Sequence, residues 1–195
     1  QMATNSWVAL GLVLVACLLL MRELLRRQGL PVTLSTLSTA LKALDATLDA
    51  VAEEYYDNLA PAIDRVWRDE VEAMRGDLRG WLQRVAEEEG AWEPIRAEFG
   101  FGIPAGGGRD PESVADPVTL DGRWKLHGVV DLVERRRDAD ELRVTDHKTG
   151  ANWTKPGMVV GGGEVLQPVL YALAVEAALK RPVTESRLFY CTAKG

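Results

Sequence analysis

The feature that most constrains this chain is a predicted β-hairpin over residues 125–150. Its two arms, roughly 125–136 and 141–149, are rich in Val and Leu, and the turn formers of residues 138–140 separate them. The Val and Leu content also predicts strands that are covered on both faces, as in the middle of a layered domain. The chain is therefore expected to fold around this hairpin.

Each arm carries an acidic residue, Asp131 in the first and Asp146 in the second. The turn places Asp131 opposite or diagonal to Asp146 or Lys148, and strand alternation puts Asp146 and Lys148 on one face. Like charges that face each other across a β-ladder destabilise it by about 0.2–1 kcal/mol. A divalent cation bound between them would make the same arrangement favourable. The alternative is that Asp131 lies at a strand end on an open face, while Asp146 and Lys148 form a surface pair.

Length and composition fit one domain with a full core and a helical appendage, because 47% of the 195 residues are apolar. We expect a helical N-terminal segment over 1–58 and a core domain over 59–195. The chain starts at Gln1 and stops at Gly195, directly after a predicted strand. We therefore expect it to be a piece of a longer protein.

Charge and cysteine content limit the kinds of function and the cellular location that the chain can have. The net charge of −6 and the pI near 5.1 argue against nucleic-acid binding by bulk electrostatics but leave room for a local basic groove. Cys17 and Cys191 are too few for a disulfide framework or a cysteine-rich zinc site. A reducing, cytoplasmic location is therefore expected.

Residues 7–21 form an uncharged, apolar run of 15 residues. A membrane span needs about 20 such residues, so we favour a buried helix. The alternative is a membrane anchor with Arg22, Arg26 and Arg27 on the cytoplasmic side, in a protein whose hairpin is incidental.

Two amphipathic helices are predicted next, over about 33–57 and 61–90, from apolar residues at spacings of three and four. The charged face of the second helix is interpreted as solvated, and a surface that guides a polynucleotide or docks a neighbouring domain is the alternative. Strands over 96–101 and 185–192 and a helix over 163–180 complete the pattern. This order predicts an α/β core with a helical N-terminal part.

Four features follow one another along this pattern: Glu98 on the short strand, G-V-V-D ending at Asp131, D-H-K at 146–148, and Q-P-V-L-Y at 167–171. Together they resemble the PD-(D/E)XK nuclease superfamily, specifically the RecB-like exonuclease branch that is fused to or partnered with DNA helicases. Members show a G-x-x-D strand, a D-x-K-T-G strand and a helix with Q-x-x-x-Y, and the likeness covers about residues 60–195. The resemblance implies an α/β fold in which helices flank a central mixed β-sheet with a restriction-endonuclease-like core.

The resemblance also implies a metal site. Asp131 and Asp146 would be ligands, with the backbone carbonyl of His147 as a third and Glu98 as a candidate for a further one. Lys148 would orient or help deprotonate the attacking water. The expected cofactor is Mg²⁺ or Mn²⁺, because such a cation prefers one or two carboxylates plus water and phosphate oxygens.

Gln167 and Tyr171 lie one turn apart on one helix face, and in relatives this pair points toward the active site and the DNA. The plainer alternatives are a first-turn polar residue and a half-buried aromatic.

Two features of the family are missing. Relatives often place a metal-binding His on a helix ahead of the sheet, whereas both histidines here lie in the hairpin. We expect His127 to be a strand residue and the His147 side chain to point away from Asp146. Some relatives hold an iron–sulfur cluster through four cysteines, and with Cys191 alone in that region we expect none in this stretch.

The resemblance thus implies a magnesium-dependent deoxyribonuclease. The expected activity is that of an exonuclease in DNA repair or recombination, acting on single-stranded DNA or a DNA end, with a helicase domain or subunit as partner. The alternative is a catalytically impaired nuclease-fold module that binds DNA or serves as a scaffold in a helicase–nuclease complex. Intact Asp131, Asp146 and Lys148 favour the first reading, while the missing His and the net negative charge favour the second.

Overall fold

The computed structural model describes residues 32–59, 61–88, 90–107, 109–148, 160–163 and 165–191. In chain order the elements are α2 (Leu37–Leu59), α3 (Asp64–Glu87), β1 (Trp92–Phe101), β2 (Val118–Leu120), β3 (Trp124–Leu126), β4 (Gly128–Arg136), β5 (Leu142–Lys148), the short 3₁₀ helix η1 (Val160–Gly163), α4 (Gln167–Leu179) and β6 (Val183–Tyr190). The apolar run at 7–21 and the predicted strand end at Thr192 lie outside the described residues. Within the described ranges, no helix has both the length and the apolar character needed to cross a membrane.

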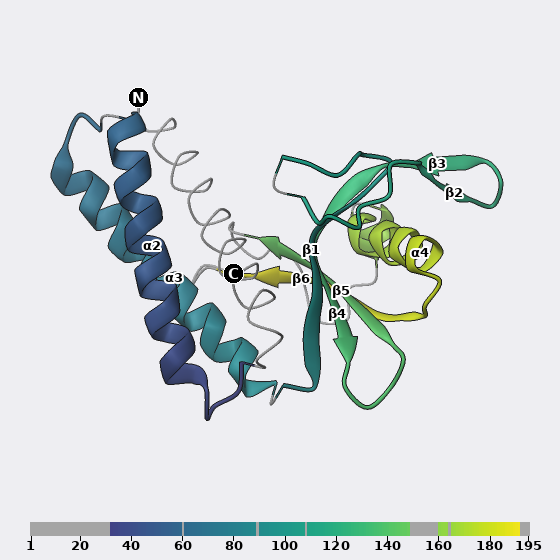
Figure 1. The fold of residues 1–195 in the computed structure, drawn as a ribbon, viewed down its shortest axis with the longest axis horizontal. Coiled ribbons are helices and arrows are strands. Elements are labelled where there is room, and N and C mark those ends of the chain that lie inside the picture. Colours follow the sequence, from purple (N-terminus) through teal and green to yellow (C-terminus); the bar gives the residue numbers. More distant parts are fainter. Residues whose placement is uncertain are drawn as a thin grey trace.

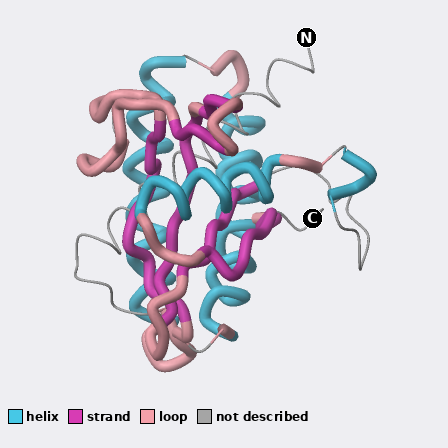
Figure 2. The backbone as a smooth tube through the Cα atoms, turned by 90° about the vertical axis from the view of Figure 1, so that its right-hand side faces the viewer, coloured by secondary structure: helices cyan, strands magenta, loops and turns pink. Residues whose placement is uncertain are grey.

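Four strands form the central sheet in the order β1-β4-β5-β6. β4 is antiparallel to both β1 and β5, whereas β6 joins β5 in parallel. Figures 1 and 2 show α4 on one face of this sheet and α3 with α2 on the other. The predicted α/β class, with a mixed sheet flanked by helices, is confirmed.

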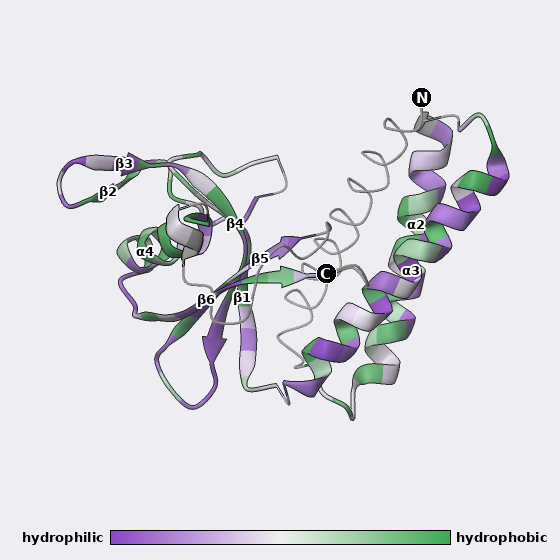
Figure 3. Cartoon of the chain, turned by 180° about the vertical axis from the view of Figure 1, so that it is seen from behind, coloured by the Kyte–Doolittle hydropathy of each residue, from purple (hydrophilic) through white to green (hydrophobic). Residues whose placement is uncertain are grey.

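α2 and α3 bury the apolar stripes that predicted them. Leu44 and Leu48 of α2 and Leu78 and Trp81 of α3 are buried in one cluster, which also contains Leu132 of the sheet. Hydrophobic and hydrophilic residues alternate along both helices (Figure 3), as a period of 3.6 residues requires. This cluster fixes the two helices to one face of the sheet.

The charged face of α3 has two parts. Near the start of the helix, Arg65 and Arg68 are exposed and pair with acidic residues one turn away. Farther along, Arg75 and Arg79 pair with Asp45 of α2. The predicted solvated face is therefore present at the start of α3, and the later part of that face contacts α2.

The first arm of the predicted hairpin is split in two. Residues 124–126 form β3, which pairs with β2 in a separate two-stranded sheet, and the central strand begins at Gly128. His127 lies between β3 and β4 and is exposed, so its prediction as a strand residue is wrong. The end of β1 approaches closely here: Gly102 has a φ of 70°, and a Cβ on it would lie 2.6 Å from the His127 Cβ.

Two helices are shorter than predicted. α3 begins at Asp64 and ends at Glu87, and α4 begins at Gln167 instead of residue 163. Gly162 and Gly163 have positive φ, which an α-helix does not accommodate, and a proline in the first turn favours the later start.

Candidate active site

At one point along β1 and β4, the regular alternation of side chains between the two faces of the central sheet is interrupted. In a regular strand Ala97 and Phe99 would face the same side, but Ala97 packs with α2 and α3 while Phe99 packs in the cluster that contains α4. Their partners on β4, Leu132 and Val130, are divided in the same way. Glu98 between them has a φ of 55°, a left-handed value that is uncommon for a non-glycine residue. Such irregularities re-aim side chains next to active sites.

Asp131 lies across from Glu98, between paired positions of β1 and β4. Its Oδ2 accepts a hydrogen bond from the backbone N–H of His147 at 2.7 Å, which ties the side chain to β5. Burial raises the pKa of Asp131 to about 7; the His147 N–H opposes this rise, and the charges of Asp146 and Glu98 add to it. Asp131 is therefore close enough to both acids to be affected by their charges.

Asp146, Lys148 and Gln167 form a closed group of contacts on the face covered by α4. Gln167 Nε2 donates to Asp146 Oδ1 at 2.9 Å, and Lys148 Nζ donates to Gln167 Oε1 at 2.8 Å. Lys148 Nζ also forms an ion pair with Asp146 Oδ2, a buried atom that accepts no hydrogen bond of suitable geometry from the described residues. The predicted shared face of Asp146 and Lys148 is thus observed, and the first residue of α4 joins the pair.

Glu98 and Tyr171, the other two predicted site residues, lie in different surroundings. Glu98 is half-buried, which raises its pKa, and the charge of Arg109 partly offsets this effect. The Tyr171 ring packs edge-on against Phe101, with ring centroids 6.0 Å apart, in the apolar cluster on the α4 side. The structure therefore places Tyr171 as a half-buried aromatic, which was the plainer sequence alternative, and its contact with DNA stays a prediction.

The His147 side chain points to the opposite face, as strand alternation predicts. Its ring lies edge-on to Trp81 of α3 and to Phe189 of β6, with centroids 5.7 Å and 6.2 Å away. Burial, together with the charge of Arg187, lowers the pKa of His147 to about 3, so the imidazole is neutral. The ring is therefore part of the core, and the backbone carbonyl stays the predicted ligand.

The carboxylates of Asp131 and Asp146 fit a hard divalent cation. They come from neighbouring strands, and a cation between them would offset both the burial that raises the pKa of Asp131 and the charge of Asp146 that adds to this rise. Mg²⁺ takes one or two carboxylates and completes its shell with water and phosphate oxygens. Among the described residues no group of three or more His, Cys, Asp or Glu side chains is placed to hold an ion, so the fit rests on these two acids.

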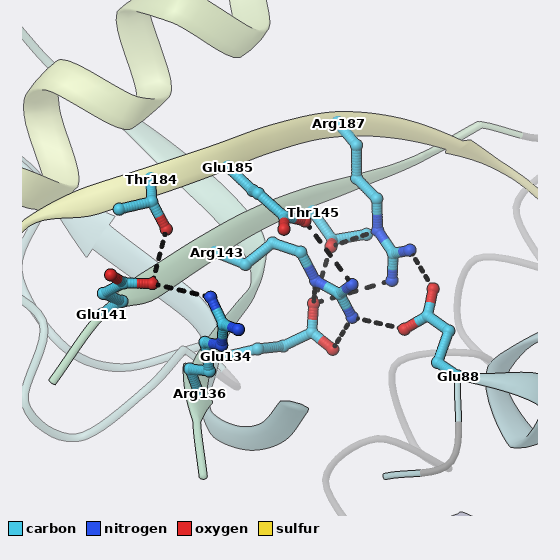
Figure 4. A network of polar contacts seen from close by, with 9 residues as sticks. All are labelled: Glu88, Glu134, Arg136, Glu141, Arg143, Thr145, Thr184, Glu185 and Arg187. Atoms are coloured by element: carbon cyan, nitrogen blue, oxygen red, sulfur yellow. Dashed lines mark hydrogen bonds and ion pairs between the residues drawn. The ribbon is translucent and has the colours of Figure 1, made fainter. Parts of the chain in front are cut away.

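A charged network on the other face of the sheet links β4, β5 and β6 to α3 (Figure 4). Arg143 is 3% exposed, and its guanidinium donates to both oxygens of Glu134 at 2.8 Å. Thr145 also donates to Glu134, while Glu88 accepts hydrogen bonds from both Arg143 and Arg187. Burial opposes ionisation of Glu88, yet the two arginines lower its pKa. The network therefore connects the strands that carry Asp131 and Asp146 to each other and to the end of α3.

Sequence reasoning missed this network. The available signal was that Arg143 and Thr145 share one strand face, with Glu134 at a paired position on the neighbouring strand. Polar residues that alternate with Leu142 and Val144 on a strand covered on both faces indicate buried polar pairing.

The mixed sheet between helices, with two acids and a lysine on adjacent strands, defines a restriction-endonuclease-like core. A family model described as the PD-(D/E)XK nuclease superfamily matches residues 19–195, and the chain belongs to this superfamily. Its members are generally nucleases that hydrolyse phosphodiester bonds in DNA, and they usually use Mg²⁺ or Mn²⁺. No curated protein matches the chain.

Proposed function

We propose that the chain is a magnesium-dependent deoxyribonuclease that hydrolyses phosphodiester bonds beside Asp131, Asp146 and Lys148. The observation that carries the proposal is the closed group of Asp146, Lys148 and Gln167, with Asp131 on the adjoining strand. A cation held by two carboxylates can activate water directly, so the reaction needs no nucleophile from the protein.

Each residue has a separate role in this proposal. Asp131 and Asp146 bind the cation, and Glu98 and the backbone carbonyl of His147 are proposed as further ligands. When bound, the cation lowers the pKa of a coordinated water and offsets the charge of the scissile phosphate. Lys148, held beside Asp146, orients the attacking water or donates to a phosphate oxygen.

Gln167 is a positioning residue. One end of its amide bonds Asp146 and the other bonds Lys148, so it fixes the distance between the acid and the ammonium group. Because Gln167 is the first residue of α4, the helix and the strand are joined at the site. Tyr171, one turn farther along, packs α4 against the sheet and is proposed to approach the DNA.

The finer assignment rests on the sequence resemblance. The G-V-V-D, D-H-K-T-G and Q-P-V-L-Y motifs favour the RecB-like branch, and with it an exonuclease that acts on single-stranded DNA or a DNA end. A helicase partner, a role in repair or recombination, a cytoplasmic location and the division into residues 1–58 and 59–195 belong to the same proposal.

A second candidate function is a catalytically impaired module that binds DNA without cutting it. The observation that favours it is the lack of a third acidic or His ligand in the part of the chain that the structure describes. Loss of cleavage with retained DNA binding would be its signature.

The test is cleavage of end-labelled linear and circular single-stranded DNA with and without Mg²⁺. We expect the chain to degrade the linear strand from an end, to require the cation, and to lose activity by roughly 10²- to 10⁴-fold in Asp146→Asn and Lys148→Met. His127→Asn serves as a matched control, because this exposed residue lies between β3 and β4 and should leave the rate unchanged.

The outcomes separate the two functions. DNA binding without cleavage at any Mg²⁺ concentration would support the impaired module, and cleavage that survives in Asp146→Asn would contradict the proposed site. The cleavage rate of a variant is compared with that of the parent only if its thermal unfolding transition shows that it is folded.

A further inference from the structure

We propose that Trp124, at the tip of the β2–β3 hairpin, is a base-stacking residue that holds single-stranded nucleic acid leading to the active site. The proposal rests on the proposed nuclease function and adds a contact away from the reacting phosphate. It assigns a role to a hairpin that the sequence analysis did not identify.

The hairpin presents Trp124 in a fixed position. Asp121 and Gly122 have φ values of 50° and 65°, the left-handed pair that a type I′ turn requires, and Arg123 N donates to Leu120 O at 3.0 Å. Trp124 follows this turn directly and pairs with Leu120. A residue held in this way loses little further freedom when it binds a ligand.

Trp124 is the most exposed large hydrophobic residue of the described chain, at 69% of its surface. Its chain neighbours Arg123 and Lys125 are also exposed, so the hairpin tip carries two cations, next to exposed Asp121, in a protein whose net charge is −6. An aromatic face for a base and cations for the adjoining phosphates are the two parts of a single-strand binding surface. The residue is therefore suited to an unstacked base.

The hairpin is attached to the helix that begins at the active site. Leu120 and Leu126 pack in the same cluster as Ala174 and Val175 of α4, about 11 Å along the helix axis from Gln167. In Figure 1 the hairpin extends over α4 and past it. The contact fixes the position of the hairpin relative to the site.

The distance to the site suits a short strand. Trp124 and Asp131 are seven positions apart in the chain, so their Cα atoms are at most about 25 Å apart. Single-strand binding surfaces engage roughly 4–16 nucleotides per module, enough to cover such a span. One strand can therefore contact Trp124 and present a phosphate to the two acids at the same time.

The test compares the affinity of the chain for a labelled 12-nucleotide single strand and for an abasic strand of equal length, by fluorescence anisotropy in EDTA. We expect Trp124→Ala to bind the base-containing strand roughly 5- to 150-fold more weakly, the loss typical of one stacked base. The abasic strand should bind Trp124→Ala as it binds the parent protein. Trp124→Phe, which keeps an aromatic face, should recover most of the affinity.

Two further variants serve as controls. Ile63→Ala removes an exposed apolar side chain just ahead of α3 and should change neither affinity. Lys125→Ala should weaken the binding of both DNA strands equally and lower the salt dependence of binding by about one ion, as expected for a phosphate contact.

Unchanged affinity in Trp124→Ala, or an equal loss for both strands, would overturn the stacking role. Failure of the proposed nuclease function gives a different result, because the parent chain would then fail to cut the strand with Mg²⁺, whereas the stacking role is measured by binding in EDTA. Normal cleavage by the parent chain together with unchanged binding in Trp124→Ala would remove this inference alone.

Discussion

Asp131 and His147 are joined by one hydrogen bond, and burial shifts their pKa values in opposite directions. The pKa of Asp131 rises from 3.8 to about 7, so the folded protein binds the extra proton between these values and loses stability as the pH rises. The pKa of His147 falls from 6.5 to about 3, so the unfolded chain binds the extra proton and stability increases with pH. The two contributions oppose each other between about pH 4 and 6.5.

Asp131→Asn should reveal how His147 alone makes the free energy of unfolding depend on pH. We expect its free energy of unfolding to rise with pH between 4 and 6.5 more steeply than that of the parent protein, by up to about 1.4 kcal/mol per pH unit. Above pH 7 and without divalent cations, the variant should be the more stable of the two. Urea unfolding across this range measures both effects, and parallel profiles would show that the Asp131 carboxyl is not held in an unfavourable environment.

Gln167→Leu should impair the site without unfolding it. The variant keeps the size of the side chain but loses the bonds to Asp146 and Lys148. We expect a roughly 10- to 100-fold lower rate of DNA cleavage and a higher Mg²⁺ requirement, the cost typical of losing a group that orients a ligand.

Gln83→Leu provides the comparison, because this glutamine is exposed on α3. Its Mg²⁺ requirement should match that of the parent protein. If both leucine variants show the same Mg²⁺ dependence, Gln167 does not position the acid and the lysine.

At the scale of elements, β4 and β5 depend on charged side chains that replace apolar packing on the α3 face. Glu134 and Arg143 are 4% and 3% exposed, and the Arg143 guanidinium also lies 4.8 Å from the centroid of the Trp92 ring. A buried pair of this kind contributes little net stability relative to apolar residues, but removal of one partner leaves an uncompensated charge. Because Glu134 and Arg143 lie directly opposite each other, the pair is satisfied only when β4 and β5 keep this register.

Arg143→Met should lower the free energy of unfolding by about 3–5 kcal/mol, because Glu134 loses its main partner. The double variant Arg143→Met with Glu134→Leu should recover much of the loss. Arg136→Met changes an exposed arginine of the same strand pair and should stay within about 0.5 kcal/mol of the parent protein. Denaturant unfolding measures all three, and a double variant as unstable as the single one would contradict a charge-based explanation.

At the scale of the whole molecule, the sequence predicted what depends on local pattern. Strand alternation placed Asp146 and Lys148 on one face, and the 3.6-residue period located α2 and α3. The superfamily followed from motifs that span several elements, and the family match confirms it.

The remaining features depend on contacts between distant parts of the chain. The hydrogen bond from Arg143 to Glu88 joins residues that are far apart in sequence, and no local sequence pattern predicts it. The change of face at Glu98 follows from one backbone dihedral angle. The turn at Asp121 and Gly122 could have been predicted, because an Asp-Gly pair between two short apolar segments is a strong hairpin signal.

The central claim is that Asp131 and Asp146 hold one divalent cation together, and Mn²⁺ titration by calorimetry tests it most directly. We expect the parent chain to bind Mn²⁺, and Asp131→Asn and Asp146→Asn each to weaken binding by more than the roughly 10- to 100-fold that loss of a supporting partner costs. Asp138→Asn, at an exposed acid in the turn after β4, should bind as the parent does. Mn²⁺ binding that persists unchanged in both site variants would contradict the claim.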